Sequence, residues 1–429
     1  MAKKNVLVFP CGSEIGLEIH KSLQYSTHFT VFGGSSVDDH GLFVYKNYIP
    51  DMPFFDAPDF IEKLNKLVAE HKIDFIMPAH DDVVVVLAQA KAAGKLQAEV
   101  VTSSIETCQI ARSKLQTYQT LQDVIPTPQV YKSVEAVPEG AYPIFLKPES
   151  GQGSRGTQKA TTAEAAAFYL KQDSSLLLLE YLPGKEFTVD CFTDKDGKLQ
   201  VSEGRERTRI SNGISVNSSV VKDPRFAELA NKINQKLSFR GAWFFQVKEN
   251  TAGELVLMEI APRIAGTMGL IRCRGINLVL LSLFDAMGYP IDAFENDYQM
   301  TIDRALQNTY SHDVKYSCVY LDLDDSVLVD GKVNPDIMAF VYQCHNEGVK
   351  VCLLTRHKAD LGTTLKKYRL SDAFDELIQV AEGQEKAPLI TQKDAIFIDD
   401  SFAERKKVHQ ACGIPVFDTH MVESLLTKF

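Results

Sequence analysis

The stretch YPIFLKPESGQGSRG, residues 142–156, decides how the middle of this chain is interpreted. Its apolar first half predicts a buried β-strand that bears Lys147, and its second half predicts a loop with three glycines. Glycine lets main-chain N–H groups approach phosphate oxygens, while lysine and arginine offset their negative charge. Taken alone, such a loop is as often a hairpin without chemical importance, and no Walker Gly-Lys-Ser/Thr sequence follows it. The loop residues of interest are Ser150, Gly151, Gly153, Ser154, Arg155 and Gly156.

The segment LLLLEYLPGKEFTVD, residues 176–190, adds two carboxylates at strand ends. Glu180 follows an apolar run, where it could meet an adenine amino group, and Glu186 is placed to accept hydrogen bonds from ribose hydroxyls. The alternative for either residue is a solvated charge at the end of a strand.

Two further strands carry candidate metal ligands. FFQVKEN (244–250) and LVLMEIAPRIAG (255–266) predict neighbouring strands around a turn at residues 251–253. They contain Gln246 and Glu259, both oxygen donors of the hard type that Mg²⁺ prefers. Because Glu259 interrupts an apolar run, we expect a cation to compensate its charge.

Short apolar runs alternate with helical stretches along most of the chain, which predicts an α/β protein with largely parallel sheets. At 429 residues the chain exceeds what one hydrophobic core usually supports, so we expect several domains. Near the middle, strands dominate, and there we expect an antiparallel, two-layered sheet. The predicted domains are a Rossmann-like domain at residues 1–106, an α+β domain at 107–305 and a small Rossmannoid domain at 314–429.

Taken in order, these motifs resemble the ATP-grasp superfamily, in the branch that contains carbamoyl-phosphate synthetase domains and amino-acid ligases. The resemblance covers the first two predicted domains, with a pre-ATP-grasp domain at 1–106 and a lid subdomain at about 115–182. It implies that ATP is bound by Lys114, Lys147, Gly151, Gly153 and Ser154 at the phosphates, by Glu180 and Tyr181 at the adenine, and by Glu186 at the ribose. It also implies that Mg²⁺, or Mn²⁺, is bound by Gln246 and Glu259, that Arg263 holds the transferred phosphate, and that Arg207 or Arg209 lies near the acceptor carboxylate.

The activity that this resemblance implies is an ATP- and Mg²⁺-dependent carboxylate–amine ligase. Such enzymes form an acyl phosphate and then an amide or peptide-like bond between small-molecule substrates. Arg209, Arg272 and Arg274 are candidate clamps for a carboxylate or phosphate, because the guanidinium fork suits both anions; a surface arginine without a ligand is the alternative for each.

The chain departs from the family pattern at one position. The family usually carries a further metal-binding residue in E-x-N-P-R, and Ala261 stands here in place of the asparagine. A second Mg²⁺ would lose a ligand there, which leaves single-metal chemistry, a substitute ligand or reduced activity open. Two alternatives for the function of the chain also stay open. One is a carbamoyl-phosphate-synthetase-like kinase or ligase acting on another carboxylate, such as one on a sugar or polymer. The other is an ATP-binding regulatory protein with weakened catalysis.

The last third of the chain places polar residues after three apolar runs. CVYLDLDDSVLV, residues 318–329, carries Asp322 and Asp324 two positions apart, and so on the same side of a strand. Carboxylates that point together repel unless a cation lies between them. Since parallel strands end at one edge of a sheet, we expect a single site. The other candidates at this edge are Thr355, Lys386, which opens a helix-like stretch, Asp399 and Asp400.

Residues 316–429 resemble the haloacid-dehalogenase-type (HAD) phosphotransferases. The resemblance implies that Asp322 is the nucleophile and Asp324 the general acid and base, with Thr355 and Lys386 as phosphate contacts. It implies a Mg²⁺ site drawn from Asp322, Asp324, Asp399 and Asp400. The intervals between these motifs leave no room for a cap domain, so we expect a large substrate or a partner domain as the cap. An inactive spacer with this fold is the alternative.

A net charge of −10 argues against nucleic acid as the main partner, because phosphate backbones normally need a basic face. The eight cysteines form no C-x-x-C pair, which favours free thiols in a reducing cytoplasm. No apolar run reaches the length of a membrane span. We therefore expect a cytoplasmic protein without nucleic-acid or membrane partners, with a homodimer as one candidate assembly.

Overall fold

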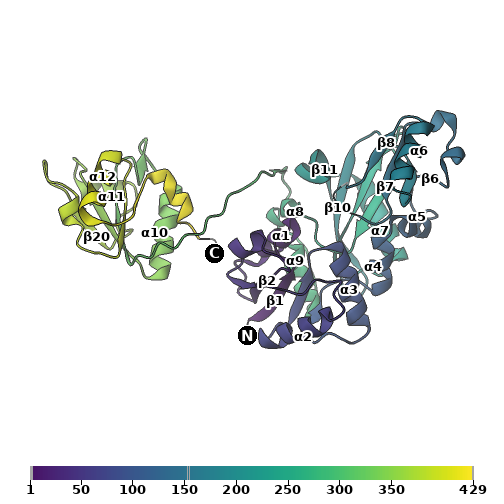
Figure 1. Ribbon diagram of the computed structural model, residues 1–429, viewed down its shortest axis with the longest axis horizontal. Coiled ribbons are helices and arrows are strands. Elements are labelled where there is room, and N and C mark those ends of the chain that lie inside the picture. The colour runs from purple at the N-terminus through teal and green to yellow at the C-terminus, as the bar shows by residue number, and fades with distance from the viewer. Residues whose placement is uncertain (1–2, 152, 154, 428–429) are drawn as a thin grey trace. The chain divides into compact units, whose positions relative to one another are not determined.

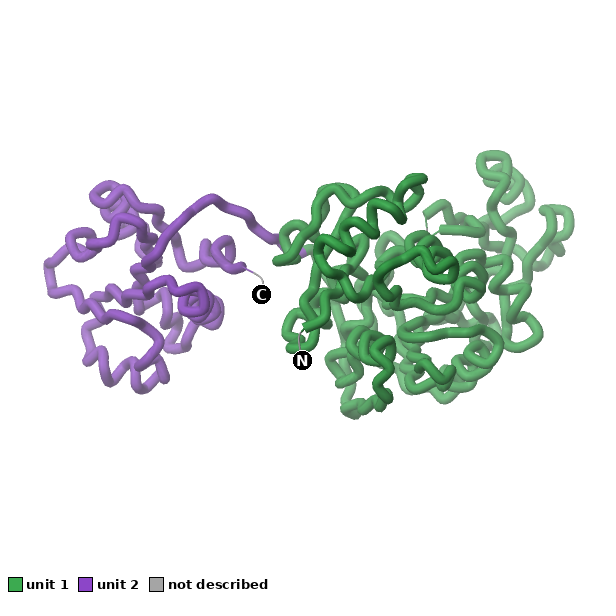
Figure 2. The backbone as a smooth tube through the Cα atoms, turned by 90° about the horizontal axis from the view of Figure 1, so that it is seen from below, with its two compact units in different colours: residues 1–306 green, residues 307–429 purple. Residues whose placement is uncertain are grey.

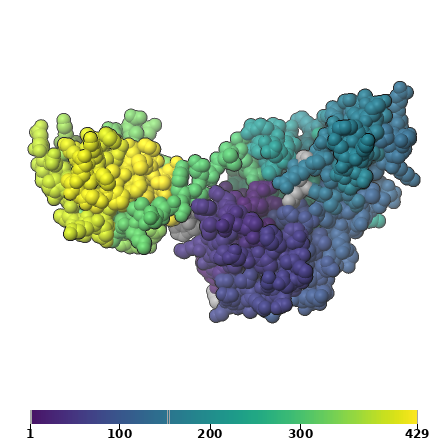
Figure 3. All heavy atoms as spheres, viewed as in Figure 1, coloured from purple at the N-terminus to yellow at the C-terminus, as the bar shows by residue number. Residues whose placement is uncertain are grey.

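The computed structural model describes residues 3–151, 153 and 155–427. The chain folds into two compact units, residues 1–306 (unit 1) and residues 307–429 (unit 2), which Figure 2 colours separately. In the space-filling view, the purple, blue and teal residues of unit 1 form one continuous surface (Figure 3).

A parallel sheet opens unit 1. Its elements are β1 Lys4–Phe9, α1 Glu14–Leu23, β2 Phe29–Gly34, η1 His40–Phe43, β3 Asn47–Ile49, α2 Phe60–Glu70, β4 Phe75–Pro78, α3 Asp81–Ala92 and β5 Glu99–Val100. The strand order is β3-β2-β1-β4-β5. Val6, Leu7 and Val8 of β1 are fully buried, as expected for a central strand covered on both faces. Figure 1 shows α1, α2 and α3 around β1 and β2.

The turns after β1 and β4 position two acids. Ser13 Oγ accepts a hydrogen bond from Gly16 N at 3.2 Å, so α1 begins directly with Glu14. At the start of α3, His80 Nδ1 accepts from Asp82 N at 3.3 Å, with Asp81 in the first turn. Both acids follow the carboxyl ends of parallel strands, where open α/β sheets bind ligands.

An antiparallel sheet forms the middle of unit 1. Its elements are β10 Glu186–Thr193, β11 Leu199–Ser211, β12 Ile214–Val221, α7 Pro224–Lys236, β13 Gly241–Glu249, β14 Leu255–Ala261 and β15 Thr301–Asp303. The strand order is β14-β13-β10-β11-β12-β15. Trp243, Phe245 and Val247 alternate along β13 and share a core with Phe226 and Ile233 of α7. The predicted β13–β14 hairpin is confirmed.

A smaller four-stranded sheet carries the segment on which the sequence interpretation rests. Its elements are β6 Val130–Tyr131, η2 Val134–Ala136, η3 Glu139–Ala141, β7 Ile144–Pro148, β8 Gln158–Ala160, α6 Ala163–Gln172 and β9 Leu176–Glu180, with the strand order β6-β9-β7-β8. Ile144, Leu146 and Leu178 belong to a core of its own. The predicted strand with Lys147 is β7, and the glycine-rich loop follows it. Unit 1 also contains α4 Ile105–Arg112, α5 Lys114–Leu121, α8 Gly269–Cys273 and α9 Leu278–Ala286.

Unit 2 is built on a second parallel sheet. Its elements are β16 Cys318–Leu321, β17 Leu328–Val329, β18 Lys332–Val333, α10 Pro335–Glu347, β19 Lys350–Thr355, α11 Leu361–Lys367, β20 Glu376–Gln379, η4 Ala387–Leu389, β21 Ala395–Ile398, α12 Phe402–Cys412, β22 Val416–Phe417 and η5 Thr419–Ser424. The order is β20-β19-β16-β21-β22, and all these pairs are parallel. The ends of β16, β19 and β21 therefore meet at one edge.

The mixed α/β fold class is confirmed. The division at residue 106 stays a prediction, because residues 1–306 form one compact unit. All eight cysteines are free thiols, and six of them are buried. Across the described ranges, no helix combines the length and hydropathy that a bilayer crossing requires. The cytoplasmic location and the homodimer stay predictions.

Candidate functional site

Two adjoining pockets in unit 1 bring most of the predicted nucleotide residues together. The small pocket, of about 270 Å³, is lined from β7, β9, β10, β13 and β14, and the large pocket, of about 740 Å³, reaches the turns after β1 and β4. They share Lys114, Gln246 and Glu259. The predicted residues that line the small pocket are Lys114, Lys147, Gly151, Gly153, Glu180, Tyr181, Glu186, Arg207, Gln246 and Glu259.

Two lysines border the small pocket from different elements. Lys147 Nζ on β7 donates to the Met258 main-chain oxygen at 3.1 Å, and Lys114 Nζ on α5 donates to the Gly151 main-chain oxygen at 3.1 Å. Burial lowers the pKa of Lys147 to about 7, and the positive charge of Lys114 acts in the same direction. Burial also lowers the pKa of Lys114. An anion between the two lysines would oppose these effects, so the pair is suited to phosphate.

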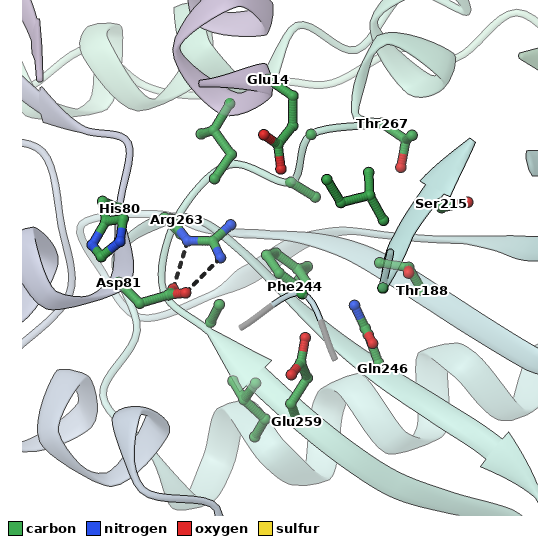
Figure 4. A pocket seen from close by; sticks show the side chains of 18 of the residues that line it. Glu14, His80, Asp81, Thr188, Ser215, Phe244, Gln246, Glu259, Arg263 and Thr267 are labelled. Atoms are coloured by element: carbon green, nitrogen blue, oxygen red, sulfur yellow. Dashed lines mark hydrogen bonds and ion pairs between the residues drawn. The ribbon is translucent and has the colours of Figure 1, made fainter. Parts of the chain in front are cut away.

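Gln246 and Glu259 lie directly opposite each other on β13 and β14, which confirms their predicted placement on neighbouring strands. Figure 4 shows both side chains pointing into the large pocket. Glu259 is partly buried, and no described residue forms a hydrogen bond or ion pair with its carboxylate. A carboxylate in this state beside an amide oxygen suits Mg²⁺, which prefers hard oxygen ligands.

Arg207 lies against two predicted ligand residues. Its Nη1 donates to Gln246 Oε1 at 2.7 Å and pairs with the Glu186 carboxylate, while Nη2 donates to the Gly213 main-chain oxygen at 2.8 Å. The Gln246 amide oxygen has two lone pairs, so this contact leaves one of them for a metal ion.

Arg209 is not brought to the site. Its Nη2 pairs with Asp303 at 2.6 Å, its side chain is 59% exposed, and it lines neither pocket. The pairing of β11 with β12 shifts register on both sides of Arg209. Such an irregularity redirects a side chain, so Arg209 does not share the position of Arg207 two residues earlier.

The end of the small pocket predicted for adenine combines apolar and acidic groups. Glu180 ends β9, and burial raises its pKa. The Tyr181 ring lies 4.0 Å from Lys159 Nζ. Leu182 and Leu257 add apolar wall, which suits a flat base. Gly151 and Gly153 line both pockets, whereas the predicted Ser154 lies outside the described residues.

The sequence did not single out Asp81, which holds Arg263. Arg263 Nε and Nη2 donate to the two Asp81 carboxylate oxygens at 2.6 and 2.8 Å (Figure 4). Burial acts to raise the pKa of Asp81, but the Arg263 charge and hydrogen bond outweigh it and hold the pKa below its usual value. This pair fixes a cationic fork in the wall of the large pocket, connecting α3 to the segment after β14.

Arg272 and Arg274 are not brought to the two pockets. Arg272 Nε donates to Glu18 at 2.7 Å, and Arg274 is fully buried and pairs with Glu295. Neither lines the small or the large pocket. Both guanidinium groups instead compensate carboxylates of unit 1 itself.

In unit 2, a lysine lies between the predicted nucleophile Asp322 and the predicted metal ligand Asp399. Lys386 Nζ donates to Asp322 Oδ1 and to Asp399 Oδ2, each at 2.7 Å. Burial raises the pKa of Asp322 to about 6, although Lys386 acts against this effect. One oxygen from each of Asp322, Asp399 and Asp400 lies within 4.8 Å of the others, which suits a divalent cation. The helix-like stretch predicted after Lys386 is the short 3-10 helix η4, for which Lys386 is the N-cap. It is only three residues long, because the backbone at Ile390 is extended.

Asp324 does not join this acidic group. Its carboxylate oxygens lie 3.0 Å from His357 Nδ1, and His357 Nε2 lies 2.8 Å from Thr364 Oγ1. The strand ends at Leu321, so the two-residue spacing no longer places Asp324 beside Asp322. Thr355 ends β19 and is fully buried at the same sheet edge. Sequence reasoning missed His357, whose only signal was its position two residues after Thr355.

Comparisons with known proteins give unit 1 its context. The family model described as "ATP-grasp in the biosynthetic pathway with Ter operon" matches residues 172–307. Residues 172–307 are therefore similar to an ATP-grasp domain. Comparison with curated proteins gave no match.

Several solved structures are similar to this chain in fold at low sequence identity. The biotin carboxylase–β-γ-ATP complex of Campylobacter jejuni is similar at a TM-score of 0.57 and 15% identity, covering 68% of this chain and 72% of its own. The ADP complex of N5-carboxyaminoimidazole synthetase from Staphylococcus aureus is similar at a TM-score of 0.56 and 18% identity, covering 71% of this chain and 83% of its own. The L-amino acid ligase of Bacillus licheniformis is similar at a TM-score of 0.53 and 16% identity, covering 68% of this chain and 75% of its own. These likenesses concern the fold.

The residues that line the two pockets fit a magnesium nucleotide. Lys114 and Lys147 offer cationic donors, and Gln246 and Glu259 offer oxygen ligands on facing strands. Ala261 lines the large pocket and offers no side-chain ligand, so water or substrate oxygen would complete a Mg²⁺ shell.

Proposed function

We propose that the chain is an ATP- and Mg²⁺-dependent carboxylate–amine ligase that forms an amide or peptide-like bond. The observation that carries this proposal is that Lys114, Lys147 and Glu259 border one pocket, which shares part of its lining with a larger pocket bordered by Arg263. The ATP-grasp fold of the solved relatives supports it.

The two pockets suit two parts of one reaction. A substrate carboxylate in the large pocket would attack the γ-phosphorus of ATP, releasing ADP and leaving an acyl phosphate. An amine would then attack the acyl carbon. A C–N bond forms, the acyl C–O bond breaks, phosphate leaves with that oxygen and its electron pair, and the nitrogen loses a proton. Bound Mg²⁺ would neutralise phosphate charge during the transfer.

The residues of this chain would bind and orient these groups. Lys114 and Lys147 would hold phosphate oxygens, and Arg263 would hold the transferred phosphoryl group because Asp81 fixes its orientation. The loop with Gly151 and Gly153 lines both pockets and would cover the phosphates, which limits hydrolysis of an acyl phosphate by water.

Release of ADP tests the ligase proposal. Purified protein with Mg²⁺, ATP and a matrix of carboxylates and amines should release ADP only with a productive pair. With the active carboxylate labelled with ¹⁸O, one label should appear in inorganic phosphate, because the acyl-phosphate route transfers that oxygen. Tight ATP binding without turnover would instead favour the regulatory alternative, for which Ala261 is the specific observation.

We further propose that unit 2 is a HAD-type phosphatase with Asp322 as its nucleophile. The support is the group formed by Asp322, Asp399 and Asp400, with Lys386 bridging two of these acids. In this proposal Lys386 and Thr355 contact the substrate phosphate, and Asp324, oriented by His357, exchanges protons with the leaving group. Mg²⁺-dependent hydrolysis of p-nitrophenyl phosphate tests it.

A further inference from the structure

The charged side chains around the large pocket are mostly paired or belong to its nucleotide end. Lys114, Arg155 and Glu259 lie at that end, with the glycine-rich loop and the shared wall. The paired residues are Arg263 with Asp81, Arg112 with Asp82, Arg205 with Asp190, and Arg207 with Glu186. Histidine aside, two described acidic or basic side chains of the lining are then neither paired nor part of the nucleotide end. They are Glu14 and Arg304.

Glu14 presents a carboxylate to the pocket on the side away from Gln246 and Glu259. It is the first residue of α1, and Figure 4 shows its side chain pointing into the cavity. Within the described part of the chain, no hydrogen bond or ion pair engages this carboxylate. An acid in the first turn also stabilises a helix, but that role does not require it to point into a cavity.

Arg304 supplies the opposite charge nearby. It follows β15, where its main-chain N–H donates to the Val216 oxygen at 2.7 Å. Its guanidinium Nη1 makes a long contact of 3.4 Å with the Ser215 main-chain oxygen. Its charge also acts on the Glu18 carboxylate, but no described carboxylate lies within ion-pair distance of it. Most of its five N–H donors are therefore available to an anion.

Gly266 lies against both of these side chains. A Cβ atom at this position would lie 2.7 Å from Glu14 Cγ and 3.5 Å from Arg304 Nη1. Those two atoms are therefore no more than about 6 Å apart, yet the side chains form no ion pair with each other. A small molecule with a positive and a negative group a few bonds apart would bridge them.

We infer that the amine substrate of the proposed ligase is a compact amino acid-like zwitterion, with its ammonium group at Glu14 and its carboxylate at Arg304. This inference rests on the proposed function and specifies the chemical class of its second substrate. A simple alkylamine would leave Arg304 without a partner, and an acidic substrate without an amino group would face the Glu14 carboxylate unfavourably.

The test compares amino acids with their amides, which keep the ammonium group and lack the carboxylate. ADP release by the full chain is measured with Mg²⁺, ATP and the active carboxylate, over a panel of amino acids each beside its amide. The best amino acid should have a KM about tenfold or more below that of its amide, because a charge-assisted hydrogen bond is lost. Equal KM values for the two would overturn the inference while leaving the ligase proposal in place.

Variants assign each charge to its residue. Arg304→Gln should raise KM for the amino acid about tenfold or more and leave KM for the amide unchanged, whereas Glu14→Gln should raise both. Glu14→Asp should recover part of the loss, and Glu70→Gln, at an exposed site on α2, should change neither KM. KM for ATP should stay constant throughout. If Arg304→Gln raised KM equally for the amino acid and its amide, the assignment would be contradicted. If no pair of substrates gave ADP release, the proposed function would be overturned together with the inference.

Discussion

The Lys147 ammonium group lies 3.1 Å from the main-chain oxygen of Met258, the residue directly before Glu259. This contact connects β7 of the four-stranded sheet to β14 of the six-stranded sheet. Because its partner is a neutral carbonyl, Lys147 keeps two N–H donors and an uncompensated charge when protonated. The sequence placed these residues more than a hundred positions apart, and the fold brings them to one pocket.

Nucleotide binding should be accompanied by protonation of the Lys147 side chain. Burial sets the pKa of its free ammonium group at about 7, so at pH 8 most of it is neutral, and a bound phosphate raises the pKa. We expect proton uptake approaching about one per nucleotide at pH 8, and affinity that falls as pH rises above 7. Titration calorimetry in two buffers of different ionisation enthalpy measures the uptake. Lys147→Met should abolish it, and the exposed control Lys132→Met should not; equal uptake in both variants would refute the assignment.

Asp81→Asn should destabilise unit 1 and impair turnover. The Arg263 side chain is 9% exposed, and removing its partner leaves a largely buried charge, at a cost of roughly 3 kcal/mol. Asp82→Asn breaks the more exposed pair with Arg112 and should cost under about 1 kcal/mol. Urea unfolding of both variants gives the comparison. A larger loss for Asp82→Asn would mean that the Asp81–Arg263 pair does not anchor α3.

Glu259→Gln should separate nucleotide binding from turnover. The amide keeps the size of the side chain and removes the negative ligand, so ADP release should fall at least about a hundredfold. Phosphatase activity should stay unchanged, since separate sites act independently. The exposed Glu228→Gln on α7 is the matched control. ADP release at the wild-type rate in Glu259→Gln would exclude this carboxylate as the metal ligand.

Asp322→Asn should abolish hydrolysis of p-nitrophenyl phosphate and leave ADP release intact. An amide cannot accept the phosphoryl group as the carboxylate does, while Lys386 keeps its contact with Asp399. Asp372→Asn, at an exposed position of unit 2, controls for loss of a charge. Hydrolysis that persists in Asp322→Asn and disappears on chelation of Mg²⁺ would point to another nucleophile.

Local sequence patterns predicted the placement of residues that depends only on their position within one strand or hairpin. The buried strand with Lys147 and the facing pair Gln246 and Glu259 followed from apolar runs and a turn signal. The contact of Asp81 with Arg263 spans 182 positions, and no local pattern connects residues at that distance.

The direction in which a side chain points was the second feature that the sequence did not predict. Arg207 and Arg209 are equivalent by strand periodicity, but a register shift in β11 turns only Arg207 toward the pockets. Asp322 and Asp324 are likewise equivalent in sequence, yet the strand ends before them and they contact different partners. Such shifts depend on the neighbouring strand and loop, which a single sequence does not specify.

Titration of the protein with a non-hydrolysable ATP analogue in Mg²⁺ is the most direct test of the central claim that one magnesium nucleotide lies between Lys147 and Glu259. We predict one nucleotide per chain, a loss of affinity of about tenfold or more in Lys147→Met, and weaker Mg²⁺ dependence in Glu259→Gln. Unchanged affinity in Lys147→Met and unchanged Mg²⁺ dependence in Glu259→Gln would contradict the claim.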